Sequence, residues 1–153
     1  MLEVDLSDDY ANAKYISNAK SFPEKWQKKA TNFRNERALF SNLELDIPYG
    51  PSDREKMDIF YPKIGTTGVF VFIHGGYWRA FDKSTWSHLS LGALDNGFVS
   101  VIPSYRLCPE VSIAQITLDI AKCIIAIANR VNSGPIVLAG HSAGGHLVSR
   151  MLC

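Results

Sequence analysis

The chain is poor in cysteine, in net charge and in long hydrophobic runs. Its three cysteines, Cys108, Cys123 and Cys153, include no CxxC pair, which argues against a disulfide framework and against a zinc site. The 16 Lys and Arg residues nearly balance the 15 Asp and Glu residues, so the net charge of +1 favours neither nucleic acid nor an anionic membrane as a partner. No stretch approaches the roughly 18 apolar residues that a membrane span needs.

The first residues do not have the pattern of a secretory signal. Met1–Tyr10 carries the acids Glu3, Asp5, Asp8 and Asp9 and no apolar run. Together with the unpaired cysteines, this predicts a cytoplasmic protein. We expect a small-molecule substrate as its partner, with no nucleic acid, no membrane, no cofactor and no metal.

The residues that are present are typical of a globular domain, with 46% hydrophobic and 20% charged. Residues 1–40 are predicted to form an N-terminal helical cap segment. Within it, Trp26, Ala30 and Phe33 share one face of a helix over 23–37. Residues 41–153 have a different pattern and are interpreted as a second unit.

This second unit begins with two runs, 43–47 and 57–61, in which apolar and polar residues alternate around turn residues. They predict an antiparallel pair of strands. Three further strands are expected over 69–73, 98–102 and 136–139. The run 69–73 (VFVFI) is apolar without alternation, which is typical of a strand covered on both faces.

Helices are predicted between these strands, over 84–95 and again from Ser112 to Val131. In the second helix isoleucines recur at steps of three and four, and Ser112 with Gln115 predicts a capping box at its start. Strands alternating with helices predict an α/β fold: a mostly parallel sheet with helices on both faces.

A nucleophile motif follows the strand over 136–139. Gly140-His141-Ser142-Ala143-Gly144 is G-x-S-x-G between a strand and a helix, the context in which a serine is held on a strained turn with its hydroxyl exposed. We therefore predict Ser142 as a catalytic nucleophile. A phosphate loop is the competing interpretation, but G-x-x-x-x-G-K-[ST] is absent.

A second glycine motif, His74-Gly75-Gly76-Tyr77-Trp78, ends the strand over 69–73. Backbone N–H groups at such a loop can stabilise the alkoxide of a tetrahedral intermediate. We assign Gly75, Gly76 and Ala143 to an oxyanion hole. Tyr77 and Trp78 either bind substrate or pack the loop. His74 is expected to order the turn by hydrogen bonding rather than to act as a base.

These motifs, with Asp58-Ile59-Phe60-Tyr61-Pro62 and Ser104-Tyr105-Arg106-Leu107, resemble the kynurenine formamidase (arylformamidase) branch of the α/β-hydrolases, which is related to the hormone-sensitive-lipase-like esterases. The resemblance covers about residues 45–153. It implies a serine hydrolase that converts N-formyl-L-kynurenine and water into L-kynurenine and formate. On this basis residues 41–153 are expected to be the N-terminal half of an α/β-hydrolase domain.

The family places its triad acid and histidine after the serine. Residues 143–153 contain no Asp or Glu and no plausible base. We therefore expect a fold truncated after the helix that follows Ser142, little activity from this chain alone, and self-association through an exposed sheet edge at 136–139. Two alternatives stay open: a carboxylesterase acting on small acyl esters, and a non-catalytic fragment or pseudoenzyme that binds a partner.

Overall fold

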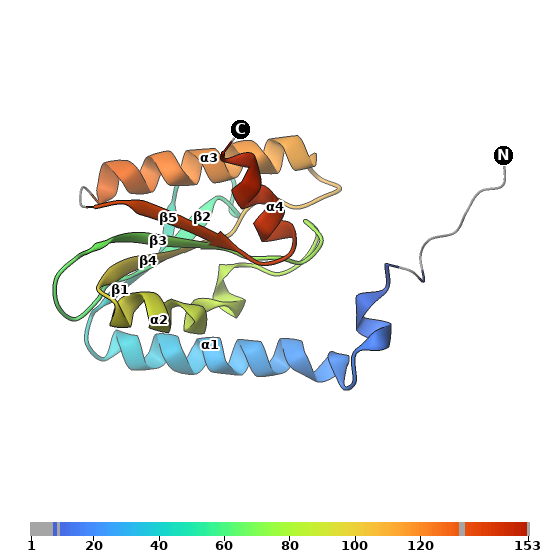
Figure 1. Cartoon of the computed structure of the whole chain (residues 1–153), viewed down its shortest axis with the longest axis horizontal. Coiled ribbons are helices and arrows are strands. Elements are labelled where there is room, and N and C mark those ends of the chain that lie inside the picture. The colour runs from blue at the N-terminus through green and yellow to red at the C-terminus, as the bar shows by residue number, and fades with distance from the viewer. Residues whose placement is uncertain (1–7, 9, 132–133, 153) are drawn as a thin grey trace.

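The computed structural model describes residues 8, 10–131 and 134–152. A single twisted sheet lies between two layers of helices (Figure 1). Its strand order is β1-β2-β4-β3-β5. The strands are β1 (Leu43–Pro48), β2 (Lys56–Phe60), β3 (Gly68–Ile73), β4 (Phe98–Pro103) and β5 (Ile136–Gly140).

The sheet is mixed. β1 pairs with β2 and β2 pairs with β4 in antiparallel register, whereas β3 pairs with both β4 and β5 in parallel. The predicted antiparallel pair is confirmed, as is the α/β-hydrolase fold class. Because β3 and β5 are parallel neighbours, their carboxyl ends lie side by side, and the two glycine motifs that follow them meet there.

Helices cover both faces of the sheet. α1 (Phe22–Ala38) and α2 (Leu91–Asp95) lie on one face, and α3 (Ile113–Arg130) and α4 (Ala143–Arg150) lie on the other (Figure 1). Short 3₁₀ helices, η1 (Asn12–Tyr15) and η2 (Ala19–Ser21), precede α1. The predicted helix over 23–37 is confirmed, with Ala30 and Phe33 on its buried side.

The helix predicted over 84–95 is wrong in detail. The segment consists of two 3₁₀ helices, η3 (Lys83–Thr85) and η4 (Ser87–Ser90), followed by the short α2. Local polar groups explain the break. The Asp82 carboxylate accepts hydrogen bonds from the Ser84 amide and hydroxyl. The Arg34 guanidinium from α1 donates a hydrogen bond to the Ser84 carbonyl. Bonds of this kind compete with the regular pattern of an α-helix.

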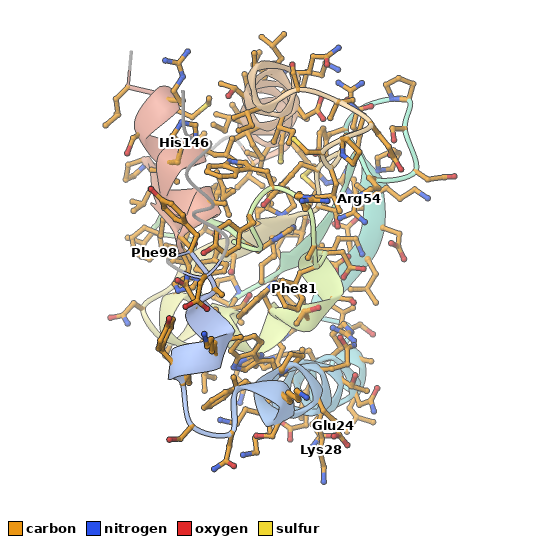
Figure 2. All side chains as sticks on the ribbon, turned by 90° about the vertical axis from the view of Figure 1, so that its right-hand side faces the viewer. Glu24, Lys28, Arg54, Phe81, Phe98 and His146 are labelled. Atoms are coloured by element: carbon orange, nitrogen blue, oxygen red, sulfur yellow. The ribbon has the colours of Figure 1, made fainter. Side chains whose placement is uncertain are left out.

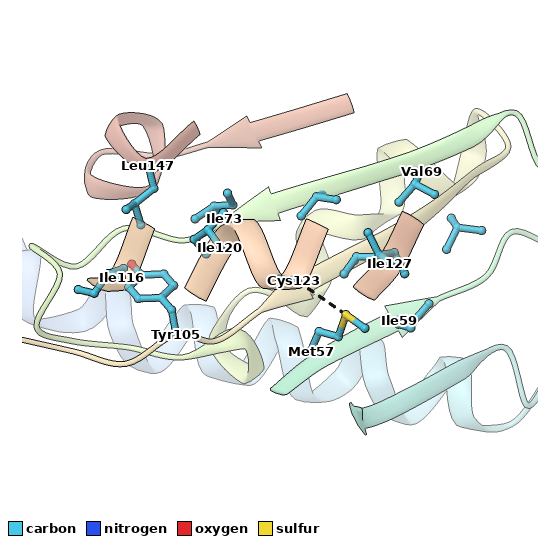
Figure 3. Packing of buried hydrophobic residues seen from close by; sticks show 13 residues of the cluster. Met57, Ile59, Val69, Ile73, Tyr105, Ile116, Ile120, Cys123, Ile127 and Leu147 are labelled. Atoms are coloured by element: carbon cyan, nitrogen blue, oxygen red, sulfur yellow. Dashed lines mark hydrogen bonds between the residues drawn. The ribbon is translucent and has the colours of Figure 1, made fainter. Parts of the chain in front are cut away.

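The strands supply two hydrophobic cores, because successive side chains point to opposite faces. Val69, Val71 and Ile73 of β3 pack toward α3, and Phe72 between them packs toward α1. The run without alternation at 69–73 therefore does indicate a strand covered on both sides. Figure 3 shows the larger core, in which the Cys123 thiol lies 3.8 Å from the Met57 sulfur.

Helix α3 is held by the features that its sequence predicts. Ser112 and Gln115 form the capping box, and Ile116, Ile120 and Ile127 are fully buried. Burial of each such side chain contributes roughly 1.5–3 kcal/mol to folding. The helix packs its buried side against β3 from Val69 to Ile73 and so supports this face of the sheet.

Strand β5 forms one edge of the sheet within the described residues, and its Val137 is 42% exposed. Self-association through this edge stays a prediction. Among the described residues, no helix has the length and apolar character that crossing a bilayer would require.

Candidate active site

Ser142 lies on a sharp turn, here called the elbow (residues 140–144), between the end of β5 and the start of α4. Its backbone has φ 55° and ψ −120°, a conformation that costs a non-glycine residue about 1–3 kcal/mol. The residue is exposed to solvent. The elbow therefore presents the hydroxyl at the edge of the sheet in a strained conformation.

The glycines of the elbow are required by close backbone contacts. A Cβ added to Gly140 would lie 2.4 Å from the Gly144 carbonyl oxygen, and one added to Gly144 would lie 2.0 Å from the Ile73 oxygen. These neighbours are backbone atoms and cannot rotate away. In contrast, a Cβ on Gly145 would have no neighbour closer than 3.4 Å. Glycine at 140 is therefore required by the tightness of the turn itself, and glycine at 144 lets the turn approach β3 this closely.

A second loop, here called the glycine loop (residues 74–81), runs beside the elbow. A Cβ added to Gly75 would lie 2.7 Å from the His141 carbonyl oxygen and 3.1 Å from the Ser142 Cβ. Gly76 has φ 115°, and its added Cβ would lie 2.4 Å from the Ala80 oxygen. A side chain at Gly75 would thus block the approach of the loop to the elbow, and a side chain at Gly76 would disturb the turn within the loop itself.

The backbone donors of this region are free. In the described part of the chain, no carbonyl accepts a hydrogen bond from the amides of Gly75, Gly76 or Ala143. Ala143 is the first residue of α4, so its amide belongs to the unsatisfied N–H groups of a helix start. Free N–H groups beside a serine are the arrangement that can stabilise a developing alkoxide.

His74 holds the glycine loop from inside the protein. It is fully buried, and its Nδ1 donates to the Gly75 carbonyl over 2.7 Å. Burial lowers the pKa of His74 to about 4, so the ring is neutral at pH 7. Its ring stacks on Tyr105 at 4.4 Å, away from solvent. The predicted role in ordering the turn is confirmed.

A pocket of about 460 Å³ opens in front of Ser142. The glycine loop and the elbow form one side, and residues 10–19 form another. Its base is aromatic: Trp26 lies 4.9 Å from Trp86 and 6.0 Å from Phe81, measured between ring centroids. The pocket can therefore hold a flat apolar group next to the serine hydroxyl.

The two predicted aromatic residues have different positions. Tyr77 lines the pocket, and its hydroxyl donates to the Tyr10 carbonyl over 3.0 Å. Trp78 does not line it. Its ring packs edge-on against His146, 5.3 Å away, and joins the core beside α3. Substrate contact remains a prediction for both residues.

No described side chain forms a hydrogen bond with the Ser142 hydroxyl. The carboxylates near this end of the sheet are engaged elsewhere. Asp119 is buried in a two-point ion pair with Arg106, and Asp82 caps η3. No cluster of three or more potential metal ligands occurs in the described residues.

Sequence reasoning missed two parts of the site. Residues 10–19 carry no motif, and only the fold brings them over the elbow. Arg54, in the turn between β1 and β2, donates to the carbonyls of Tyr105 and Phe81, and no local pattern marks it. No local pattern marks Tyr105 as the hydrogen-bond partner of the His74 carbonyl either.

The BD-FAE family model matches residues 57–152, which is more than half of the chain. The chain belongs to the BD-FAE family. The BD-FAE match includes β2 to β5, the glycine loop and the elbow, so every predicted site residue lies within it. Residues 10–19, which complete the pocket, lie outside it.

Curated relatives of this BD-FAE chain include two kynurenine formamidases. The zebrafish protein is 29% identical over 112 residues, and the Drosophila melanogaster protein is 31% identical over 111 residues. These alignments cover 71% and 69% of this chain, but 38% and 37% of the relatives. The chain therefore spans less than half the length of these relatives.

Solved structures give the same picture of the fold. A proposed thioesterase from Silicibacter sp. TM1040 superimposes with a TM-score of 0.92 and is 52% identical, over 98% of this chain and 56% of that one. Esterase B from Lactobacillus rhamnosis superimposes with a TM-score of 0.62 and is 21% identical. The superposition covers 88% of this chain and 49% of the esterase chain. At that identity the likeness supports the fold alone.

Proposed function

We propose that the protein is a serine hydrolase in which Ser142 is the nucleophile. The observation that carries this proposal is the placement of Gly75, with its free amide, against Ser142 on its strained turn. The amides of Gly75, Gly76 and Ala143 serve as oxyanion donors. Each donor of this kind lowers a reaction barrier by roughly 2.7–4 kcal/mol.

In the proposed reaction the Ser142 oxygen attacks the substrate carbonyl carbon while a general base takes its proton. The free amides stabilise the resulting alkoxide. Collapse of this intermediate expels the leaving group and forms an acyl-enzyme, which water then hydrolyses. His74 is not the base, because it is buried and bonded to Gly75. We propose that the base and its acid partner come from outside the described residues.

For the substrate we propose N-formyl-L-kynurenine, which would yield L-kynurenine and formate. The similarity to the zebrafish and Drosophila kynurenine formamidases supports this choice. So does the aromatic base of the pocket, since Trp26, Phe81 and Trp86 offer ring faces to the aryl group of such a substrate. The small formyl group needs little space at the elbow.

A second candidate is hydrolysis of small acyl esters or thioesters by the same serine. It is favoured by the 52% identity to the proposed thioesterase from Silicibacter. The chemistry at Ser142 is unchanged in this case, and only the acyl and leaving groups differ.

The test uses the product of the complete gene, assayed with N-formyl-L-kynurenine and with short nitrophenyl esters and thioesters. We expect the formamide to have the highest kcat/KM, and we expect Ser142→Ala to reduce turnover of every substrate by at least about 1,000-fold. A higher kcat/KM for the esters would favour the second candidate. Equal rates for Ser142→Ala and the unaltered protein would exclude the serine mechanism. Absence of turnover by the unaltered protein with every substrate would favour a non-catalytic role.

A further inference from the structure

One guanidinium outside the site bonds the last residue of the glycine loop directly and is linked to its first residue through Tyr105. Arg54 donates from Nη2 to the carbonyl of Phe81, the last residue of the loop, over 2.5 Å. From Nε it donates to the carbonyl of Tyr105, just after β4, over 2.8 Å. Figure 2 looks onto this end of the molecule and labels Arg54 and Phe81.

Tyr105 extends this contact to the first residue of the loop. Its hydroxyl donates to the His74 carbonyl over 2.7 Å, and its ring stacks on the His74 ring with an interplanar angle of 14°. Both side chains are fully buried. Burial also raises the pKa of Tyr105, which keeps the phenol protonated as a donor.

The turn that carries Arg54 is itself braced. The buried Glu55 carboxylate accepts a hydrogen bond of 2.9 Å from the Ser52 amide. It also forms an ion pair with the Lys122 ammonium of α3, at 2.8 Å. Gly50 lies so close to this carboxylate that a Cβ would be 2.4 Å from it. Arg54 therefore extends from an ordered turn and not from a free loop.

We propose that Arg54 is a positioning residue for the oxyanion donors, acting through Phe81 and Tyr105. This inference rests on the proposed function of the Gly75 and Gly76 amides. With the carbonyls of His74 and Phe81 held by Tyr105 and Arg54, the loop between them keeps its free amides beside Ser142. Hydrogen bonds from a charged donor such as Arg54 are stronger than those from a neutral donor. Oxyanion donors that are already aligned need no reorganisation during the reaction.

Arg54 touches neither Ser142 nor the pocket, so its effect on the reaction must pass through the loop. A loss of pre-organisation has a specific signature. It weakens stabilisation of the transition state, so kcat falls while KM changes little. A residue needed for folding alone would lower the fraction of active protein but leave the kcat of the folded molecules unchanged.

The experiment compares Arg54→Met, Arg54→Lys and Tyr105→Phe in the complete gene product. The matched control is Arg130→Met, which removes a guanidinium paired with Glu44 at the far end of α3. Each variant is assayed for kcat and KM, with active sites counted by covalent titration. Binding of a boronic acid, which forms a tetrahedral adduct with the serine, reports on the oxyanion donors directly.

We expect Arg54→Met to lower kcat about 10- to 100-fold, to leave KM within about twofold and to weaken boronic acid binding in parallel. Arg54→Lys should restore part of kcat, since an ammonium can still bond one carbonyl, and Tyr105→Phe should have a smaller effect in the same direction. Arg130→Met should match the unaltered protein.

The inference is overturned if Arg54→Met keeps its kcat per titrated site, whatever its stability. That result would leave the proposed function intact, provided that Ser142→Ala is inactive. If the unaltered protein shows no Ser142-dependent turnover, the proposed function fails first, and the two failures are thereby distinguished.

Discussion

The loops at the carboxyl end of β3 and the helix that packs against its face differ in how their residues are used. At the carboxyl end of the strand, the glycine loop and the elbow contain four non-glycine residues with positive φ: Tyr77, Trp78, Phe81 and Ser142. The amides of Gly75, Gly76 and Ala143 there have no backbone partner among the described residues. Beneath the strand, α3 has a complete capping box and a stripe of fully buried side chains, Ile116, Ile120, Cys123 and Ile127.

The difference indicates a division of roles within one small fold. Strained backbone and unpaired donors each cost free energy, and they persist only where the surroundings determine them strongly. The regular core of α3 and the sheet supplies that constraint. Reactivity and stability should therefore respond separately to substitutions in the two regions.

The largest effect is expected at Gly144, where the two regions touch. A methyl group there would be 2.0 Å from the Ile73 oxygen, so Gly144→Ala should destabilise the protein by at least about 3 kcal/mol and abolish activity. Gly145→Ala is the matched control, since its Cβ has ordinary contacts and a helix favours alanine by up to about 1 kcal/mol. Urea unfolding measures both. Equal stability of the two variants would contradict the close-contact account of the elbow.

A substitution in the core beneath α3 should destabilise the protein without changing the reaction at Ser142. Ile120→Ala removes a fully buried side chain and should cost about 2–5 kcal/mol of unfolding free energy. Ile125→Ala, on the exposed face of the same helix, should cost much less. The kcat per titrated active site should stay within about twofold for both. A selective loss of kcat in Ile120→Ala would mean that the two regions are not separable.

His74 belongs to both regions, because it begins the glycine loop and is buried in the core. Its burial should make the free energy of unfolding depend on pH. Its pKa is about 4 in the folded protein and 6.5 in an unfolded chain, so the unfolded chain takes up the proton first as pH falls. The stability from this group is complete above pH 6.5 and is lost toward pH 4. Between pH 7 and 4.5 the loss should be about 2 kcal/mol.

The variant His74→Asn can keep a donor near the Nδ1 position but has no such titration. Urea unfolding at the two pH values should therefore show a smaller difference for His74→Asn than for the unaltered protein, by about 2 kcal/mol. An unchanged difference would mean that His74 is not the group responsible.

The smallest effect is expected where the N-terminal segment meets the site. Tyr77→Phe removes the bond to the Tyr10 carbonyl but keeps the ring in the pocket wall. We expect a loss of stability below about 1 kcal/mol and a KM raised severalfold, with kcat nearly unchanged. Steady-state kinetics with N-formyl-L-kynurenine measure this. A KM equal to that of the unaltered protein would exclude residues 10–19 from substrate binding.

Local patterns predicted much of this molecule. The five strands, helix α1, the capping box of α3 and the strand-to-helix context of Ser142 all follow from short-range periodicity and glycine placement. The antiparallel pairing of β2 with β4 has no local signal, because register between distant segments is decided by packing. The same holds for the bonds of Arg54, which join residues 27 and 51 positions away.

The central claim is that Ser142 is the nucleophile beside the free amides of the glycine loop. The most direct measurement is to treat the complete gene product with paraoxon and to locate the diethyl phosphate by peptide mass spectrometry. We predict one adduct, on the peptide that contains Ser142, formed in step with loss of hydrolysis and absent from Ser142→Ala. Complete inactivation with the adduct on another residue, or full activity with Ser142 modified, would contradict the account.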